Sequence, residues 1–218
     1  LAMRKGLDYL EQHPNVDRSR LGVTGLSGGG WQTIVLSALD ERVAVAVPVA
    51  GYSAVLSRLE RPEDIGDIEQ NATDLLTAAD YPALTAMRAP KPTLLIYNSE
   101  DDCCFRAPLV RPYIFDEILP FFRLTGQPDH LAWHENADPG THNYQLDNRR
   151  AAYRFLARHW QVPLPEAEGE ADLKSYTELE VGLPADNLTI LGVARRLAAR
   201  RPSPVPGESA DARRARLR

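Results

Sequence analysis

The residues with the clearest chemical potential form a short glycine-rich turn at positions 25–29, with the sequence GLSGG. An apolar run at 20–25 predicts a buried strand before the turn, and residues 28–39 predict a helix after it. The pattern matches the G-x-S-x-G turn that exposes a nucleophilic serine. We therefore predict that Ser27 is a catalytic nucleophile. We expect glycine on both sides of it because side chains there would clash with the neighbouring strand and helix.

The start of a helix is also a favourable place for a developing negative charge. The backbone N–H groups of the first helical turn have no partner within the helix, and the helix dipole favours an anion there. We expect the N–H of Gly28 to face the oxyanion that forms when Ser27 attacks a carbonyl carbon. A serine hydroxyl is a weak nucleophile by itself, so this chemistry also requires a histidine base that a carboxylate orients.

The candidate acid and base each follow a later predicted strand. Asp101 lies in the loop after the apolar run TLLIY, and His142 lies in the loop between the last predicted strand and a long helix. The carboxyl ends of parallel strands meet at one edge of a sheet, where ligand crevices form. We therefore predict that Asp101 and His142 complete a catalytic triad with Ser27.

Several carboxylates lie close enough to compete for the role of the acid. Three residues separate Asp101 from the strand end at Tyr97, which is enough for the loop to turn inward. Its neighbour Asp102 is an alternative, and Glu100 and Asp138 are weaker ones. The carboxylates that are not used would be solvated or would cap the following helix.

We interpret the other histidines as packing or surface residues rather than as metal ligands. His13 lies in a turn and His159 on the last long helix, and we expect both at the surface. His130 and His134 share one face of a predicted strand without an evident third ligand. The predicted chemistry needs no metal and no organic cofactor.

The order of the elements predicts a mostly parallel α/β sheet with helices on both faces. The predicted strands cover residues 20–25, 43–50, 93–97 and 130–135, and the predicted helices cover 2–12, 28–39, 108–124 and 143–160. Residues 51–89 lack a clear period, and we interpret them as an inserted cap that shapes the leaving-group pocket. Tyr52 is a candidate for lining that pocket, with ordinary packing as the alternative.

Beyond residue 162 the composition changes. Residues 163–185 begin with an acidic, proline-rich stretch and predict a linker. Residues 186–200 predict a helix capped by Asp186 or Asn187. Residues 201–218, rich in proline, alanine and arginine, predict a disordered tail.

Composition limits the partners of the chain. The net charge of −5 over 218 residues argues against nucleic acid, and no apolar run is long enough to span a membrane. Cys103 and Cys104 are adjacent and do not form a disulfide framework, so they say little about the compartment. Export or a periplasmic location stays open, as does the oligomeric state. We expect a small-molecule or carbohydrate ester as substrate.

The residues that carry this pattern resemble a known superfamily. Residues 20–30 (RLGVTGLSGGG) and 38–47 (ALDERVAVAV) resemble the nucleophile region of bacterial acetyl xylan esterase-like and prolyl-oligopeptidase-like hydrolases. Residues 92–97 and 140–142 resemble their acid strand and histidine loop. The resemblance covers about residues 1–160 and implies an α/β-hydrolase fold with serine-dependent ester hydrolysis. Acetyl esters of carbohydrates are the substrate class it suggests.

Two departures from that family qualify the resemblance. Asn98 stands where such enzymes often have glycine, and members of the fold have several strands before the nucleophile strand. We expect this chain to be the C-terminal part of a longer hydrolase domain, with the second oxyanion donor upstream. A peptidase of the prolyl oligopeptidase type and a non-catalytic binding or scaffold module are the alternative functions.

Overall fold

The protein was analysed as a computed structural model that describes residues 2–62, 70–71, 74–164, 167–169, 173–200, 207 and 209–217. The chain forms two compact units, Leu1–Glu166 and Ala167–Arg218. The division between them falls close to residue 163, where the sequence predicts the start of a linker.

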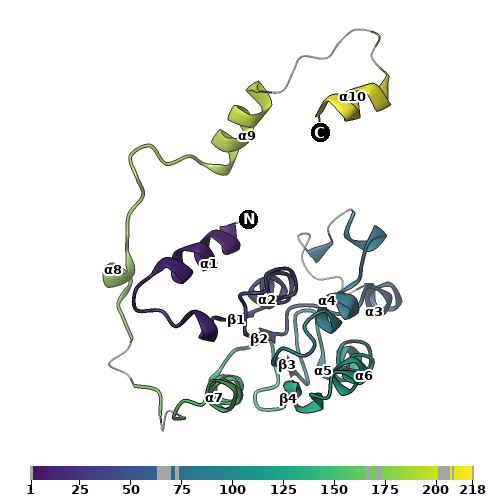
Figure 1. Ribbon diagram of the computed structural model, residues 1–218, viewed down its shortest axis with the longest axis vertical. Helices are drawn as coiled ribbons and strands as arrows, with labels where there is room; N and C mark the ends of the chain where they lie inside the picture. Colours follow the sequence, from purple (N-terminus) through teal and green to yellow (C-terminus); the bar gives the residue numbers. More distant parts are fainter. Residues whose placement is uncertain are drawn as a thin grey trace. The chain divides into compact units, whose positions relative to one another are not determined.

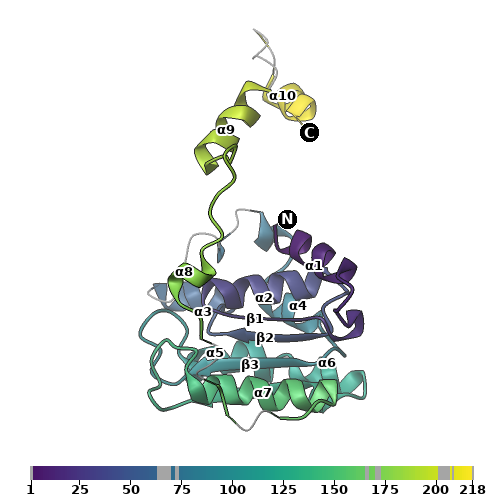
Figure 2. The same cartoon turned by 90° about the vertical axis from the view of Figure 1, so that its left-hand side faces the viewer.

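A four-stranded parallel sheet in the order β1-β2-β3-β4 forms the centre of the first unit. The strands are β1 (Gly22–Leu26), β2 (Val45–Val49), β3 (Thr93–Asn98) and β4 (Leu131–Asn136). Figure 2 shows β1, β2 and β3 side by side. Leu26 pairs with Val49, and Asn98 pairs with Asn136. The carboxyl ends of the strands therefore lie along one edge, and the predicted parallel sheet is confirmed.

Helices cover both faces of this sheet. They are α1 (Ala2–Gln12), α2 (Gly28–Leu39), α3 (Val55–Glu60), α4 (Tyr81–Ala86), α5 (Ala107–Arg111), α6 (Leu119–Leu124) and α7 (Leu146–Trp160). Figure 1 shows α7 on one side of the strands and α2, α4 and α6 on the other. Alternate side chains of a strand point to opposite faces. In β3, Leu95 and Tyr97 accordingly join the core with Ile34 of α2, whereas Leu94 and Ile96 pack with α7.

The single helix predicted at 108–124 is interrupted in the structure. It consists of α5, a wide helical turn at Pro112–Asp116 and α6. Proline has no backbone N–H and its ring clashes with the preceding turn, so it is tolerated at the start of a helix and breaks its interior. Pro112 follows the end of α5, and Pro120 lies in the first turn of α6. Ile114 and Phe122 both lie in the core cluster. The apolar side of this segment therefore faces the core on both sides of the interruption.

The segment predicted as a cap packs against the sheet where the structure describes it. It contains α3, a 3-10 turn at Leu75–Thr77 and α4, while residues 63–69 and 72–73 lie outside the described residues. Tyr81 and Leu84 of α4 are buried in the same core cluster as β3. Helix α4 is thus part of the core of the first unit rather than a separate lid over it.

The second unit contains three helices among its described residues, α8 (Tyr176–Leu179), α9 (Ile190–Ala199) and α10 (Ala210–Leu217). The cap of α9 differs from the prediction, because Thr189 and not Asp186 or Asn187 accepts the N–H of Gly192 at 3.0 Å. Helix α10 lies within the range predicted as a disordered tail, and its alanine and arginine residues favour helix. In the described part of the chain, no helix has the length and apolarity needed to cross a bilayer.

Arg88 joins several elements at the amino ends of the strands. Its side chain is almost completely buried, with 1% of the residue exposed. The guanidinium donates to the carbonyls of Ser37 and Val43 at 3.0 and 2.9 Å, and to those of Ala44 and Pro92 at 3.3 Å. Burial lowers the pKa of Arg88 to about 10, so the group remains charged at neutral pH. One cation thereby satisfies carbonyls at the end of α2 and at the start of β2 and β3.

Replacing this cation should destabilise the first unit more than any change to an exposed arginine. Arg88→Met leaves several buried carbonyls without a donor, and we expect a loss of about 3 kcal/mol or more in the free energy of unfolding. The matched control is Arg4→Met, because the Arg4 side chain is 62% exposed in its ion pair with Asp40. We expect this control to lose less than about 1 kcal/mol. Urea unfolding of both variants tests this prediction. Equal losses in the free energy of unfolding would contradict the stabilising role assigned to Arg88.

Candidate active site

Ser27 occupies the turn between β1 and α2, at the carboxyl edge of the sheet. Its backbone angles are φ 58° and ψ −119°, a conformation that costs a residue with a side chain about 1–3 kcal/mol. The Ser27 N–H donates to the carbonyl of Val49, and the Ser27 carbonyl accepts the N–H of Trp31, both at 2.9 Å. Gly28 is the first residue of α2, where helix geometry leaves N–H groups available. The turn has the strained geometry that the elbow pattern predicts.

One of the two glycines expected to be required beside Ser27 is required, and the other is not. A Cβ on Gly25 would lie 2.7 Å from the backbone of Gly29, which agrees with the prediction. A Cβ on Gly29 would meet nothing within 4 Å, so the prediction of a clash there is wrong. The close approach occurs one residue later. A Cβ on Gly30 would lie 2.6 Å from the Val49 carbonyl, because α2 crosses the end of β2 there.

Asp101 is buried, and its carboxylate is surrounded by hydrogen-bond donors. Its side chain has no exposed surface. It accepts the backbone N–H groups of Cys103 and Cys104 at 3.0 and 3.2 Å, and the Asn98 amide at 3.2 Å. Burial by itself raises the pKa of Asp101, but the hydrogen bonds from His142, Cys103 and Asn98 outweigh it and hold the pKa below the usual range. The carboxylate is therefore ionised at neutral pH.

His142 is the partner of this carboxylate. Its Nδ1 lies 2.9 Å from Oδ2 and 3.1 Å from Oδ1 of Asp101. The side chain of His142 is 18% exposed, so the ring keeps some access to solvent. With Nδ1–H donated to Asp101, the neutral ring has Nε2 as its basic nitrogen. The structure thus brings the predicted acid and the predicted base together, although 40 residues separate them in the sequence.

The loop that carries His142 also reaches the nucleophile strand. The hydroxyl of Tyr144, two residues after His142, lies 2.8 Å from the Thr24 hydroxyl of β1. The same Thr24 hydroxyl donates to the Val47 carbonyl at 2.8 Å. β1 and β4 are at opposite edges of the sheet, so the loop after β4 crosses toward β1. The contact between Tyr144 and Thr24 holds the loop there, and Thr24 is three residues before Ser27 in the sequence.

The alternative acids have other contacts. The Asp102 carboxylate accepts the backbone N–H of His142 at 2.8 Å and is exposed. Glu100 and Asp138 are also exposed, and the Glu100 N–H donates to the Gly140 carbonyl at 2.9 Å. Asp101 contacts the imidazole, whereas Asp102 helps to hold the loop.

Tyr52 differs from its predicted position. It is completely buried, and its hydroxyl lies 3.0 Å from that of Thr85. Its ring contacts those of Tyr81 and Tyr97, and its carbonyl accepts the Tyr97 hydroxyl at 2.7 Å. The structure therefore places Tyr52 in the core instead of on a pocket wall, which corresponds to the packing alternative.

The remaining histidines take part in packing and polar contacts. His134 lies 2.8 Å from Asp147, and His130 lies 2.6 Å from the Pro90 carbonyl. His159 was expected at the surface but is partly buried against Phe155, and burial lowers its pKa to about 4. Within the described ranges, no group of three or more histidine, cysteine and acidic side chains could hold a metal ion.

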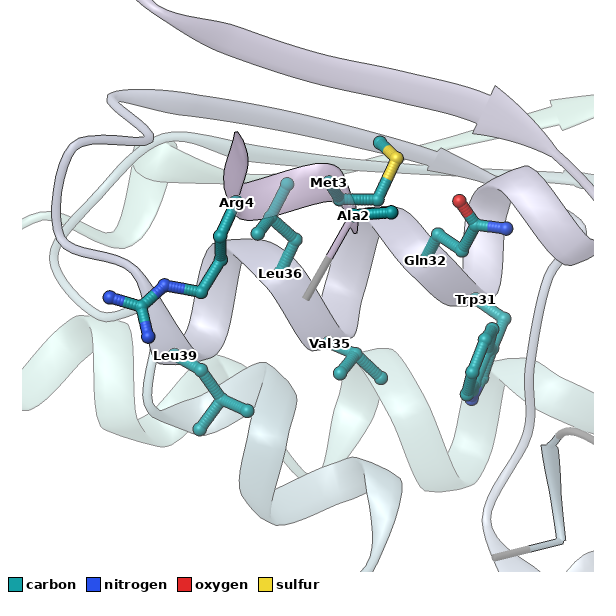
Figure 3. A pocket seen from close by; sticks show the side chains of 8 residues that line it. All are labelled: Ala2, Met3, Arg4, Trp31, Gln32, Val35, Leu36 and Leu39. Carbon is teal, nitrogen blue, oxygen red and sulfur yellow. The ribbon is translucent and has the colours of Figure 1, made fainter. Parts of the chain in front are cut away.

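An apolar groove of about 360 Å³ lies between α1 and α2, on a part of the unit that the predicted site residues do not line. Figure 3 shows Trp31, Val35 and Leu39 along α2, with Met3 above them on α1. Of the three α2 side chains, Trp31 and Val35 also pack against the core cluster, whereas Leu39 is exposed. The groove adds no chemical group to the candidate site.

Sequence reasoning missed four buried asparagines beside the pair of Asp101 and His142. Asn98, Asn136, Asn143 and Asn148 are each at most 5% exposed. A signal was present in β3, because Asn98 ends a fully buried and mostly apolar strand; β4 ends in three polar residues and gives no such signal. A polar residue at the carboxyl end of a buried strand is costly without a partner. It therefore indicates a polar network at that edge.

The comparisons with known proteins agree with this fold, which is a partial α/β-hydrolase fold. Residues 3–162 match the sequence model of the prolyl oligopeptidase family, and the chain belongs to that family. A curated relative is 4-O-methyl-glucuronoyl methylesterase 1 of Wolfiporia cocos (strain MD-104), 28% identical over 181 residues, which are 69% of this chain and 43% of that protein.

Solved structures share the fold. One is a carbohydrate esterase family 15 glucuronoyl esterase from Caldicellulosiruptor kristjansonii, with a TM-score of 0.56 and 20% identity over 73% of this chain and 49% of that one. Another is a glucuronoyl esterase from Solibacter usitatus, with a TM-score of 0.58 and 18% identity over 73% of this chain and 47% of that one. This chain spans less than half the length of each of these relatives. The predicted α/β-hydrolase resemblance is confirmed at the level of fold and family.

The geometry of the turn makes a prediction about its glycines. Gly25→Ala and Gly30→Ala force backbone atoms apart and should lower the melting temperature. Gly29→Ala meets open space and should raise stability by up to about 1 kcal/mol, because alanine favours the first turn of α2. Thermal unfolding of the three variants tests this order. A Gly29→Ala variant as unstable as Gly25→Ala would contradict it.

The two adjacent aspartates should differ in their effect on stability. Asp101→Asn replaces a buried acceptor of several hydrogen bonds, so we expect a loss of about 1.5–3 kcal/mol at pH 7. Because the folded state depresses the pKa of Asp101, its stabilisation is present above the unfolded pKa and disappears as the pH falls through the folded pKa. The difference between the wild type and Asp101→Asn should therefore shrink below about pH 4. Asp102→Asn serves as the exposed control and should cost less at pH 7, as unfolding curves at both pH values will show.

Proposed function

We propose that this protein is a serine hydrolase that cleaves carboxylic esters of carbohydrates through an acyl-enzyme. Ser27 is the nucleophile, His142 the general base and Asp101 the carboxylate that orients it. The hydrogen-bonded pair of His142 and Asp101, with Nδ1 and Oδ2 2.9 Å apart, is the observation that carries the proposal. A buried carboxylate that fixes one imidazole tautomer makes Nε2 the nitrogen that accepts a proton.

The reaction follows from these roles. His142 Nε2 takes the proton of the Ser27 hydroxyl as Oγ attacks the ester carbonyl carbon, and the carbonyl oxygen becomes an oxyanion. The backbone N–H of Gly28 donates to that oxyanion. The tetrahedral intermediate collapses, the alcohol leaves with the proton from His142, and the acyl group stays on Ser27. Water, deprotonated by His142, then attacks the acyl carbon; the bond to Ser27 Oγ breaks, the acid leaves, and Oγ takes the proton back from His142. Asp101 remains ionised throughout and stabilises the imidazolium.

Three structural features support bringing Ser27 into this reaction. The three residues follow β1, β3 and β4, whose carboxyl ends lie at one edge of the sheet. The strained turn raises the Ser27 side chain out of the sheet. The contact between Tyr144 and Thr24 draws the histidine loop toward β1. Each feature alone is compatible with a non-catalytic module, but together they favour an enzyme.

The substrate class rests on the relatives. The curated relative is a 4-O-methyl-glucuronoyl methylesterase, which favours esters of uronic acids over the acetyl esters that the sequence resemblance suggests. The matched family is named after prolyl oligopeptidases, and a peptidase is therefore the alternative function. In all of these reactions the serine attacks a carbonyl carbon, so the residue roles stay the same and the pocket selects the acyl group.

Labelling by a fluorophosphonate tests the nucleophile directly. The protein at its natural length should react at one serine, and Ser27→Ala should abolish the reaction. Ser19→Ala, at an exposed turn, should label like the wild type. His142→Ala should slow ester hydrolysis by at least about a thousandfold, as expected for the loss of a triad base. Wild-type protein that does not label would favour a binding or scaffold module.

A substrate panel separates the finer alternatives. It contains a methyl ester of 4-O-methyl-glucuronate, an acetylated xylo-oligosaccharide and a proline-containing peptide. We expect kcat/KM to be highest for the uronate ester, with the peptide uncleaved. Preference for the acetyl ester would support the acetyl xylan esterase-like alternative, and cleavage of the peptide alone would overturn the esterase proposal.

A further inference from the structure

Four buried asparagines form a connected group beneath the proposed active site. Asn98 ends β3, Asn136 ends β4, Asn143 directly follows His142, and Asn148 lies in the first turn of α7. Their exposures are 0, 1, 5 and 0%. Burial of an amide costs free energy unless it is hydrogen-bonded, and these amides bond both to one another and to the surrounding loops. The group therefore links both strands, the histidine loop and α7.

The hydrogen bonds of Asn98 form a donor-to-acceptor series that ends at Asp101, the proposed acid. Its Oδ1 accepts from the amide of Asn148 at 2.9 Å and from that of Asn143 at 3.3 Å. Its Nδ2 donates to Oδ2 of Asp101 at 3.2 Å. Hydrogen bonds in such a series polarise one another. Oδ2 is also the carboxylate oxygen nearest to His142 Nδ1, at 2.9 Å, so Asn98 acts on the atom that orients the base.

Asn143 ties the same group to the histidine loop. Its amide donates to the Thr141 carbonyl at 2.7 Å and to Oδ1 of Asn136 at 3.1 Å. Its own Oδ1 accepts the Gln145 N–H at 2.8 Å. The residues on both sides of His142 are thus held by one amide side chain, and that amide contacts Asn98.

We propose that Asn98 is a positioning residue that keeps Asp101 aligned with His142, with Asn143 fixing the histidine loop to it. This inference rests on the proposed function of the same site. The acid and the base come from separate loops after β3 and β4. The Glu100 N–H to the Gly140 carbonyl and the His142 N–H to Asp102 join these loops, but neither bond acts on the carboxylate of Asp101. Asn98 lies between the two loops and touches the acid directly. A misplacement of about 1 Å in such a constellation can cost on the order of a hundredfold in rate.

A positioning role makes a different prediction from a role in stability alone. Removal of the amide in Asn98→Leu should release Oδ2 of Asp101 and loosen its hydrogen bond with His142. The Nδ1–H proton of His142 gives a far-downfield NMR signal while a carboxylate holds it, and this signal should broaden or disappear. We expect kcat to fall about 10- to 100-fold, while KM changes less than about threefold because Asn98 is buried and does not reach substrate.

The control is Leu94→Ala, a buried apolar residue of the same strand, 4% exposed. This change costs stability through a cavity and should leave the His142 signal and kcat within about threefold of the wild type. Asn98→Ala removes the same donor but leaves room for water, so it provides the measurement if Asn98→Leu does not fold. We expect Asn98→Ala to lose the signal as well.

The two readouts keep this inference separate from the proposed function. A folded Asn98 variant that retains the His142 signal and the wild-type kcat overturns the inference and leaves the esterase proposal standing. A Leu94→Ala variant that loses the signal to the same extent also overturns it, because general destabilisation would then explain the loss. If the wild type hydrolyses no ester but the Asn98 variants still lose the signal, the positioning role holds and the proposed function fails.

Discussion

The first unit has to accommodate an ionised carboxylate that water does not reach. Taking a carboxylate out of water is expensive unless donors replace the solvent. Asp101 meets this condition with two backbone N–H groups of its own loop, one amide from β3 and the ring of His142. The donors come from three places: the loop of Asp101 itself, the end of β3 and the loop after β4. The carboxylate therefore couples the loop after β3 to the loop after β4, and the chemistry proposed for Ser27 depends on this coupling.

The polar and charged groups at the two ends of the sheet have different roles. At the amino ends of the strands, the guanidinium of Arg88 is satisfied by neutral carbonyls, and its neighbours contribute to stability. At the carboxyl ends, the strained backbone of Ser27 and the buried charge of Asp101 store unfavourable free energy that the surrounding contacts offset. Such a division is expected when one edge of a parallel sheet binds ligand.

The fold was largely predictable because its pattern is local. Apolar runs and glycine boundaries located all four strands to within about two residues, and the alternation with helices indicated the parallel sheet. Errors arose where a neighbour outside the local window decides the outcome. Tyr52 looked available for a pocket, but Tyr81 and Tyr97 bury it. Gly29 looked indispensable, yet the close approach of β2 falls on Gly30.

For the candidate site, the sequence by itself determined the residue types and their order: a serine in a glycine-rich turn, then acidic residues, then a histidine, each after a strand. It favoured Asp101 but left Asp102 as an alternative, because adjacent residues in a loop differ only in which way the backbone turns them. In the tertiary structure the turn folds so that N–H groups of Cys103 and Cys104 point at Asp101, whose carboxylate contacts His142. The tertiary structure also revealed the asparagine group, since hydrogen bonds such as that between Asn98 and Asn148 join residues 50 positions apart, and no local pattern encodes a partner at that separation.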